Sequence, residues 1–346
     1  MAYLFADTQV HEHTVNELPV MSLPEFIVQL NTWGAARLPF FFMIDFEKKK
    51  PWAVLLEELY INKPLVWYDF PAITNRIHEQ GFSPPDARLK KIPLNVNEYR
   101  ARFDKVMQHL RMGNSYLVNL TCKTPVQLNC ALKEVFLFSR AKYKVYVPGR
   151  MVVFSPETFV SISGNTIRTF PMKGTIDASV PEAAQRILEN EKEKAEHVTI
   201  VDLLRNDLSR VARKVEVKRF RYIEEIEAGG KRLLQVSSEI AGLLSDNYQA
   251  SLGNLLAELL PAGSVSGAPK NKTCEIIRDA EGEDRGYFTG VCGVFDGHTL
   301  DSAVMIRYIE QTEKGMFYRS GGGITVRSEA DVEYAEMINK IYVPID

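Results

Sequence analysis

The spacing of apolar residues along the chain predicts a mixture of amphipathic helices and strands. In residues 97–113, Tyr99, Phe103 and Val106 recur at intervals of three or four, which is the spacing of one helix face. Gly113 follows this pattern and suits the position that ends a helix. Similar patterns predict further helices at residues 23–33, 73–79, 181–208, 252–260, 271–280 and 329–341.

Shorter apolar runs rich in β-branched and aromatic residues predict strands. Residues 151–154, 158–162 and 166–170, with a turn at 163–165, are typical of a β-meander, whereas 236–244 fits either a strand or a helix. Further strands are expected at residues 40–45, 65–68, 115–121, 290–295, 303–309 and 315–320. Because strands and helices do not alternate strictly, the pattern favours an α+β or otherwise layered fold.

Composition narrows the class of protein. The 346 residues are 45% hydrophobic and 25% charged, as in ordinary globular proteins with one large domain or two. The net charge of -2 gives no positive field for nucleic acid or a membrane surface, so neither partner is expected. The four cysteines lack zinc or CxxC spacing, and the longest apolar run, 38–44, is too short to span a bilayer. We therefore expect a cytoplasmic protein with free thiols.

Two acidic pairs are the first candidates for chemistry. Glu193 with Glu196, and Glu333 with Glu336, lie three residues apart within predicted helices, so each pair shares one helix face. Two such helices facing each other would offer four oxygen ligands suited to Mg²⁺. Spacing alone nevertheless favours solvated helix faces with neighbouring lysines as partners. His197, beside the first pair, is expected to be a packed or surface residue and not a base.

Lys173 is the second candidate, in the segment PMKGT. Apolar neighbours could desolvate the amine, lower its pKa and make it a nucleophile, although most lysines in turns are solvated. Two glycine-rich segments, 261–270 and 321–323, could present backbone N–H groups to an anion or could simply form turns. The first is not a Walker A loop, because Lys270 follows a proline.

Nine segments of the chain, taken in order, are more informative than any one of them. They are NSYLVNLT (114–121), SPETF (155–159), TFPMKGT (169–175), EKEKAEHVTIVDLLRNDL (191–208), VSSEIAG (236–242), GSVSGAPK (263–270), IRY (306–308), GGGIT (321–325) and EYAEMINK (333–340). Together they resemble the chorismate-utilising enzymes, which include the large subunits of anthranilate synthase and aminodeoxychorismate synthase and the isochorismate and salicylate synthases. Residues 1–90 match only loosely and 91–346 form the chorismate-binding region. We expect both parts to belong to one structural domain.

The resemblance implies a fold and a metal site. The fold would be that of anthranilate synthase component I: two antiparallel sheets packed as a sandwich, with helices outside. The resemblance also implies that Glu196 and Glu336 bind Mg²⁺ directly, while Glu193 and Glu333 act through water. It therefore reverses the interpretation of these glutamates as solvated.

The same resemblance implies a substrate-binding set and a catalytic pair. The residues expected to bind chorismate are Arg307, Lys340, Gly322, Gly323, Tyr287, Thr175 and Ser264, the last at a position that is commonly Thr. Glu157 would act as the general acid that protonates the C4 hydroxyl, and Lys173 would attack C2 before ammonia adds at C4.

Two positions bear on the choice of reaction, and a third bears on the detailed mechanism. Leu117 stands where water-adding relatives carry a lysine base, which disfavours the isochorismate and salicylate synthases. Lys173 is similar to the nucleophilic lysine of aminodeoxychorismate synthases, whereas anthranilate synthases usually have Ala there. Two departures concern the detailed mechanism: Leu117 also replaces a frequent Gln, and Gln235 replaces a frequent His.

The expected activity is therefore that of aminodeoxychorismate synthase component I, in p-aminobenzoate and folate synthesis. Anthranilate synthase component I and a non-catalytic chorismate-binding protein are the alternatives. The chain shows no glutaminase segment, so the resemblance implies a separate glutamine amidotransferase subunit that supplies ammonia.

Overall fold

The computed structural model describes residues 17–59, 64–76, 83–228 and 231–345. Its α-helices are α1 (Leu23–Ala35), α2 (Leu56–Leu59), α3 (Val96–Arg111), α4 (Leu132–Phe138), α5 (Ala183–Glu189), α6 (Glu191–Ser209), α7 (Leu252–Leu259), α8 (Lys270–Glu281) and α9 (Ala330–Asn339), with 3-10 turns at Tyr248–Ser251 and Gly263–Val265. None of the helices in these ranges is long and apolar enough to cross a membrane.

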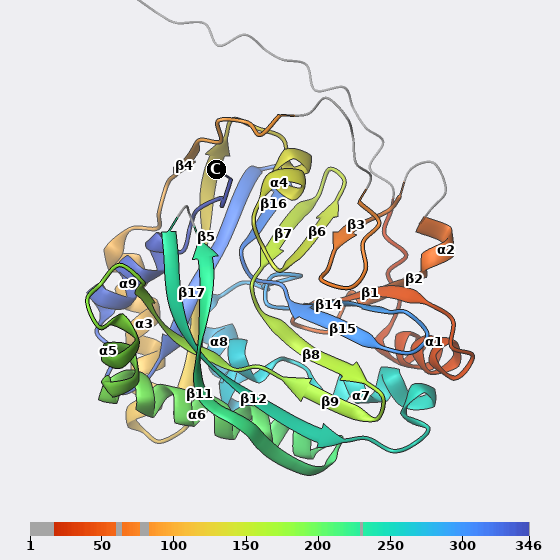
Figure 1. The fold of residues 1–346 in the computed structure, drawn as a ribbon. Helices are drawn as coiled ribbons and strands as arrows, with labels where there is room; N and C mark the ends of the chain where they lie inside the picture. Colours follow the sequence, from red (N-terminus) through yellow and green to blue (C-terminus); the bar gives the residue numbers. More distant parts are fainter. Residues whose placement is uncertain (1–16, 60–63, 77–82, 229–230, 346) are drawn as a thin grey trace, which may run out of the picture.

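Two antiparallel sheets form the framework (Figure 1). The first runs in the order β10 (Met172–Asp177), β12 (Lys231–Leu243), β9 (Thr166–Thr169), β8 (Thr158–Ser163), β15 (Leu300–Val304), β14 (Val291–Phe295), β1 (Phe40–Ile44) and β2 (Trp52–Leu55), with β11 (Arg213–Ala228) paired to β12. The second runs β13 (Gly267–Ala268), β5 (Leu117–Leu128), β17 (Gly315–Ile324), β16 (Tyr308–Thr312), β7 (Met151–Ser155), β6 (Tyr143–Val147) and β3 (Trp67–Asp69), with β4 (Leu89–Lys91) paired to β5. The predicted fold of two antiparallel sheets with helices is confirmed.

Strand β1 explains how the layers are held together. All five of its residues are buried, because it is apolar on both faces. Phe40 and Phe42 pack with α1 and α7 outside the first sheet. Phe41 and Met43 point the other way, toward the second sheet, where the Phe41 ring stacks on Tyr68 with centroids 5.5 Å apart. On the far side of the second sheet, α3, α8 and α9 cover β5 and β17.

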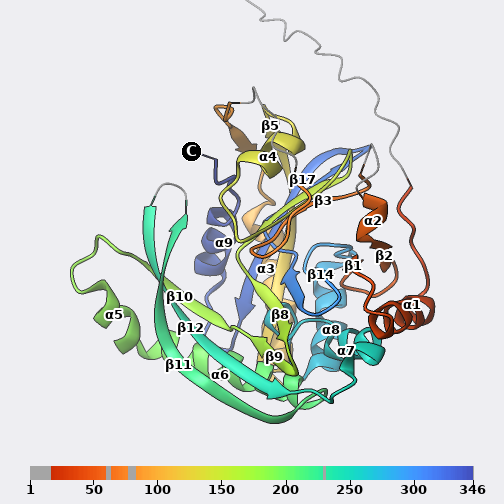
Figure 2. The ribbon, with the colours of Figure 1, turned by 45° about the vertical axis from the view of Figure 1, so that its right-hand side comes forward.

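The structure corrects four elements of the sequence prediction. Residues 73–76 are not helical, and 77–79 lie outside the described part of the chain. The long helix at 181–208 is two helices, because Asn190 is extended and its side chain accepts the N–H of Glu193, starting α6. Residues 236–243, in the segment left open between strand and helix, lie in a strand, β12. Its partner β11, a strand of 16 residues, was not predicted, and Figure 2 shows the pair as a long curved hairpin on the side of α5.

The fourth correction concerns two chain crossings between the sheets. The predicted strand at 303–309 is two strands, β15 in the first sheet and β16 in the second, and the predicted meander is also divided, with β7 in the second sheet and β8 in the first. Both divisions lie at irregular backbone: Pro156 and Glu157 separate β7 from β8, and Arg307, with φ of 53°, lies between β15 and β16.

Candidate active site

The two crossings lie side by side and bring Glu157 and Arg307 together at the junction of the sheets. The Phe154 N–H donates to the Arg307 carbonyl at 3.0 Å, and the Val304 N–H donates to the Glu157 carbonyl at 3.1 Å. The backbone is therefore held on both sides of each crossing. The Glu157 and Arg307 side chains both line one cavity here.

Glu157 has the environment of a general acid. Burial raises the pKa of its carboxyl, and this effect outweighs the hydrogen bond from Ser264 and the positive charge of Arg307, which act in the opposite direction. A carboxyl of this kind keeps its proton to a higher pH than an exposed one.

Ser264 reaches Glu157 from the 3-10 turn Gly263–Val265. An ion pair anchors the segment that carries this turn: Lys270 Nζ lies 2.9 Å from Asp207 Oδ1 at the end of α6, and both side chains are 10% exposed. The segment 261–270 thus presents the Ser264 hydroxyl to the site, one of the polar groups that its sequence offered. The segment PMKGT, which the sequence suggested as a turn, lies mostly in strand β10. The pairing of β10 with β12 shifts in register between Met172 and Thr175.

Lys173 on β10 points toward α6, where its Nζ lies 2.7 Å from Glu196 Oε2. The turn of the chain at Gly174, with φ of 84°, brings the backbone so close to α6 that an added Cβ would lie 3.0 Å from Glu193 Oε2. Burial opposes the charge on the amine, but the surrounding carboxylates, Glu196 foremost, raise the pKa of Lys173. The possibility that desolvation leaves this lysine with a lowered pKa is wrong for this arrangement, because the effect of burial is outweighed by the carboxylates.

The four candidate metal ligands, Glu193, Glu196, Glu333 and Glu336, line one cavity of about 1090 Å³ between α6 and α9. Burial and the neighbouring Glu336 raise the pKa of Glu333. Burial has the same effect on Glu336, but the Lys340 ammonium, 2.7 Å from Glu336 Oε1, lowers the pKa of that carboxyl overall.

These ligands fit magnesium in chemistry but are not assembled around an ion. Carboxylate oxygens from two walls of one cavity are the donors that Mg²⁺ prefers. In the parts of the chain that the structure describes, however, no three His, Cys, Asp or Glu side chains are grouped closely enough to hold a metal. The two carboxylates expected to bind the ion directly, Glu196 and Glu336, are each paired with a lysine.

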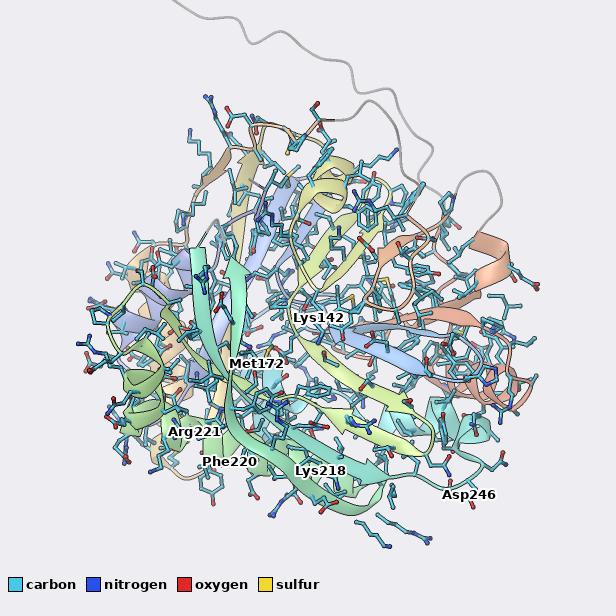
Figure 3. All side chains as sticks on the ribbon, viewed as in Figure 1. Lys142, Met172, Lys218, Phe220, Arg221 and Asp246 are labelled. Carbon is cyan, nitrogen blue, oxygen red and sulfur yellow. The ribbon has the colours of Figure 1, made fainter. Side chains whose placement is uncertain are left out.

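Two smaller compartments adjoin this cavity. One, of about 290 Å³, lies beside Leu117, and the other, of about 200 Å³, lies beside Arg307; both share Glu157 and Lys173 as lining residues. Figure 3 shows Met172, the residue before Lys173, near the centre of the molecule, to the right of α5, α6 and α9. The expected site residues that line these three spaces are Glu157, Lys173, Thr175, Glu193, Glu196, Ser264, Arg307, Gly322, Gly323, Glu333, Glu336 and Lys340.

Tyr287 is the expected residue that the structure does not bring to the site. Its hydroxyl donates to the Lys50 carbonyl at 2.8 Å, and its ring packs against the core between the sheets. The neighbouring residue, Phe288, lines the compartment beside Arg307 instead. Successive side chains point in different directions here, which the sequence alone did not resolve. Thr175 is at the site but exposed, on its rim.

The sequence analysis missed Tyr342, which lines the large cavity. Its ring centroid lies 5.3 Å from the Arg307 guanidinium, and Arg307 Nε donates to its hydroxyl at 3.4 Å. Its position two residues after Lys340 was the one feature of the sequence that could have pointed to it.

His197 is packed inside the protein. It is fully buried, its Nε2 is hydrogen-bonded to the Ser238 hydroxyl at 2.7 Å, and burial lowers its pKa to about 4.

Comparison with known proteins identifies relatives of the whole chain. The sequence profile of the chorismate binding enzymes matches residues 41–346. An uncharacterized PabA-like protein of Pasteurella multocida is 49% identical, over 94% of this chain and 100% of its own length. Aminodeoxychorismate synthase component 1 of Bacillus subtilis is 32% identical over 79% of this chain and 59% of its length. Anthranilate synthase component 1 of Archaeoglobus fulgidus is 33% identical, over 69% and 57%.

The fold also matches solved structures. An isochorismate synthase (DhbC) of Bacillus anthracis superposes with a TM-score of 0.67, covering 91% of this chain and 87% of its own, at 19% sequence identity. At this identity the likeness concerns the fold alone. The reaction has to be argued from the residues in the cavity.

Proposed function

Because this chain belongs to the chorismate binding enzymes, we propose that it aminates chorismate at C4 to give 4-amino-4-deoxychorismate, as aminodeoxychorismate synthases do. Membership of the family makes the protein an enzyme that acts on chorismate. One observation carries the finer assignment: a lysine amine, Lys173, and a buried carboxyl, Glu157, line the same compartments. This pair supplies a nucleophile and an acid to one ring.

Substrate binding in this proposal uses the positive charges around the crossing. Chorismate carries two carboxylates, and the Arg307 guanidinium can grip one of them in a bidentate manner. Lys340 lies within the same compartment, beside the backbone of Gly322 and Gly323. The four glutamates would hold Mg²⁺ for the other carboxylate, where the ion supplies positive charge that attracts the substrate and balances charge developing on it.

The reaction then needs two balanced displacements. The Lys173 ammonium first loses its proton to solvent. The neutral amine then forms a bond to C2 while the ring double bonds shift and the C4–O bond breaks, and Glu157 gives its proton to the departing hydroxyl, which leaves as water. Ammonia next forms the C4–N bond, the C2–N bond breaks, and Lys173 leaves as an amine. The Glu157 carboxylate takes a proton from the added nitrogen, which restores the acid. The pyruvyl ether is retained throughout.

Leu117 supports amination over hydration. It lines the compartment that holds Glu157 and Lys173, and an apolar side chain there offers no base to activate water. Ammonia would come from a separate glutamine amidotransferase subunit, in keeping with the PabA-like name of the Pasteurella relative. Anthranilate synthase component 1 is the second candidate, because a relative of that name is 33% identical.

The proposal is tested by the identity of the product. Purified protein is incubated with chorismate, MgCl₂ and an ammonium salt, and the product is identified by mass spectrometry and fluorescence. We expect 4-amino-4-deoxychorismate, with formation stopped by EDTA. Fluorescent anthranilate would assign the second candidate instead. If no product forms with ammonium, or with glutamine and a glutaminase subunit, amination is contradicted.

A further inference from the structure

Lys173 and Lys340 hold the two carboxylates that the proposed function assigns to the metal. Lys173 Nζ lies 2.7 Å from Glu196 Oε2, with side chains 33% and 18% exposed. Lys340 Nζ lies 2.7 Å from Glu336 Oε1 on the opposite wall. A carboxylate oxygen that accepts a hydrogen bond from an ammonium is not free to coordinate a cation in the same direction. The positive charge of each lysine also opposes a cation at the same carboxylate, so each lysine competes with metal for its glutamate.

The two lysines are not equally fixed. Lys340 also donates to the Gly321 carbonyl at 2.9 Å, so its ammonium would keep this backbone partner if it moved away from Glu336. Lys173 instead points from β10 toward α6, with Glu196 as its salt-bridge partner and both Glu336 and Glu193 contributing to its electrostatic environment. Lys173 thus interacts with three of the four glutamates that would attract a divalent cation.

We propose that, in the enzyme without substrate, the Lys173 ammonium and a divalent cation compete for the Glu196 carboxylate, so that cation binding releases Lys173 into the cavity. This inference rests on the proposed function, since it assigns the freed side chain to the ring of chorismate. It adds an order of events to that function: the cation binds first, and Lys173 is released afterwards. The nucleophile stays paired with Glu196 until the site is loaded, which protects the amine from other electrophiles.

Metal titration without chorismate tests the competition. Mg²⁺ binding is measured by isothermal titration calorimetry on the wild type and on Lys173→Met, and Mn²⁺ binding by electron paramagnetic resonance. Lys173→Met should bind the cation about tenfold more tightly, equal to about 1.4 kcal/mol. Lys173→Arg keeps a charge that can pair with Glu196 and should stay within about threefold of wild type.

Lys194→Met is the matched control, because it removes the same charge from the neighbouring turn of α6. Lys194 pairs at 3.5 Å with the exposed Glu191 and should change the affinity by less than about twofold. Equal or weaker binding by Lys173→Met, with a wild-type circular dichroism spectrum, would overturn the competition. So would equal tightening by Lys194→Met, or no cation binding by any variant. The product assay on the wild type tests the proposed function separately, because it identifies the product and does not depend on the measured cation affinities.

Discussion

The buried pair of Arg285 and Glu281 gives a prediction whose size follows from the structure. Arg285 is 1% exposed, and its guanidinium donates twice to Glu281, with Nε 2.9 Å from Oε2. It also donates to the carbonyls of Val265 at 2.8 Å and Asn119 at 2.7 Å. One side chain therefore connects α8 with β5 and with the turn that carries Ser264.

Replacing Arg285 by Met should be strongly destabilising. The change leaves a buried Glu281 carboxylate without its cation and removes the donor of two buried carbonyls. Removing one partner of a buried pair costs about 3–5 kcal/mol of the free energy of unfolding. Replacing both partners, Arg285→Met with Glu281→Met, should recover at least about 1 kcal/mol of that loss, because no uncompensated charge remains.

Equilibrium urea denaturation, followed by tryptophan fluorescence, measures these changes. Arg88→Met is the control: Arg88 pairs with Asp86 at 2.6 Å, but the side chains are 80% and 75% exposed. This control should lose less than about 1 kcal/mol. The reasoning is refuted if Arg285→Met costs no more than Arg88→Met, or if the double variant is no more stable than Arg285→Met.

Three further predictions concern the site. Lys173→Ala should abolish the covalent adduct with chorismate seen by intact-protein mass spectrometry while chorismate binding by calorimetry persists; unchanged turnover would remove the assignment of nucleophile. Because burial raises the pKa of Glu157 and the Ser264 hydroxyl opposes that rise, Ser264→Ala should move the loss of kcat at alkaline pH to higher pH, and an unmoved or lowered alkaline limb would contradict this. Gly174→Ala should lose about 1–2 kcal/mol of stability in thermal melts, because φ is 84° and the added Cβ would lie near Glu193. The control is Gly164→Ala at an exposed position: its Cβ would meet no atom within 4 Å, so this variant measures the cost of a positive φ without a close contact.

The elements that the sequence predicted best are those whose apolar pattern reflects one packing face. Helix α3 is of this kind, since one apolar face packs into a core. Strand β1 was predicted for another reason: its apolar run is unbroken and is buried on both faces. Strand β11 could not be recognised, because its 16 residues are rich in Arg, Lys and Glu and lie at the edge of a sheet. The run 303–309 is apolar except for Arg307, and one charged residue within a strand-like run does not reveal that the chain changes sheets there.

The candidate site was predictable in its residue types and not in its arrangement. Spacing placed Glu193 with Glu196 on one helix face, but whether two such faces meet depends on contacts far apart in sequence. Resemblance supplied that pairing and also supplied Tyr287, where the structure brings Phe288 instead. The pKa of Lys173 could not be judged from its apolar neighbours, because the carboxylates that raise it come from α6 and α9.

The crossings between the sheets explain why one fold can serve several reactions. At Glu157 and Arg307 the chain leaves one sheet for the other, and the backbone of each residue is held by the opposite crossing. Side chains there can be exchanged without disturbing a sheet ladder, so substitution changes chemistry at little cost to the fold. The match to the Bacillus anthracis DhbC structure, with a TM-score of 0.67 at 19% identity, shows that the fold persists while most side chains change. Under the proposed function, the choice between water and ammonia falls to side chains such as Leu117 and Lys173, which line the cavity from strands β5 and β10.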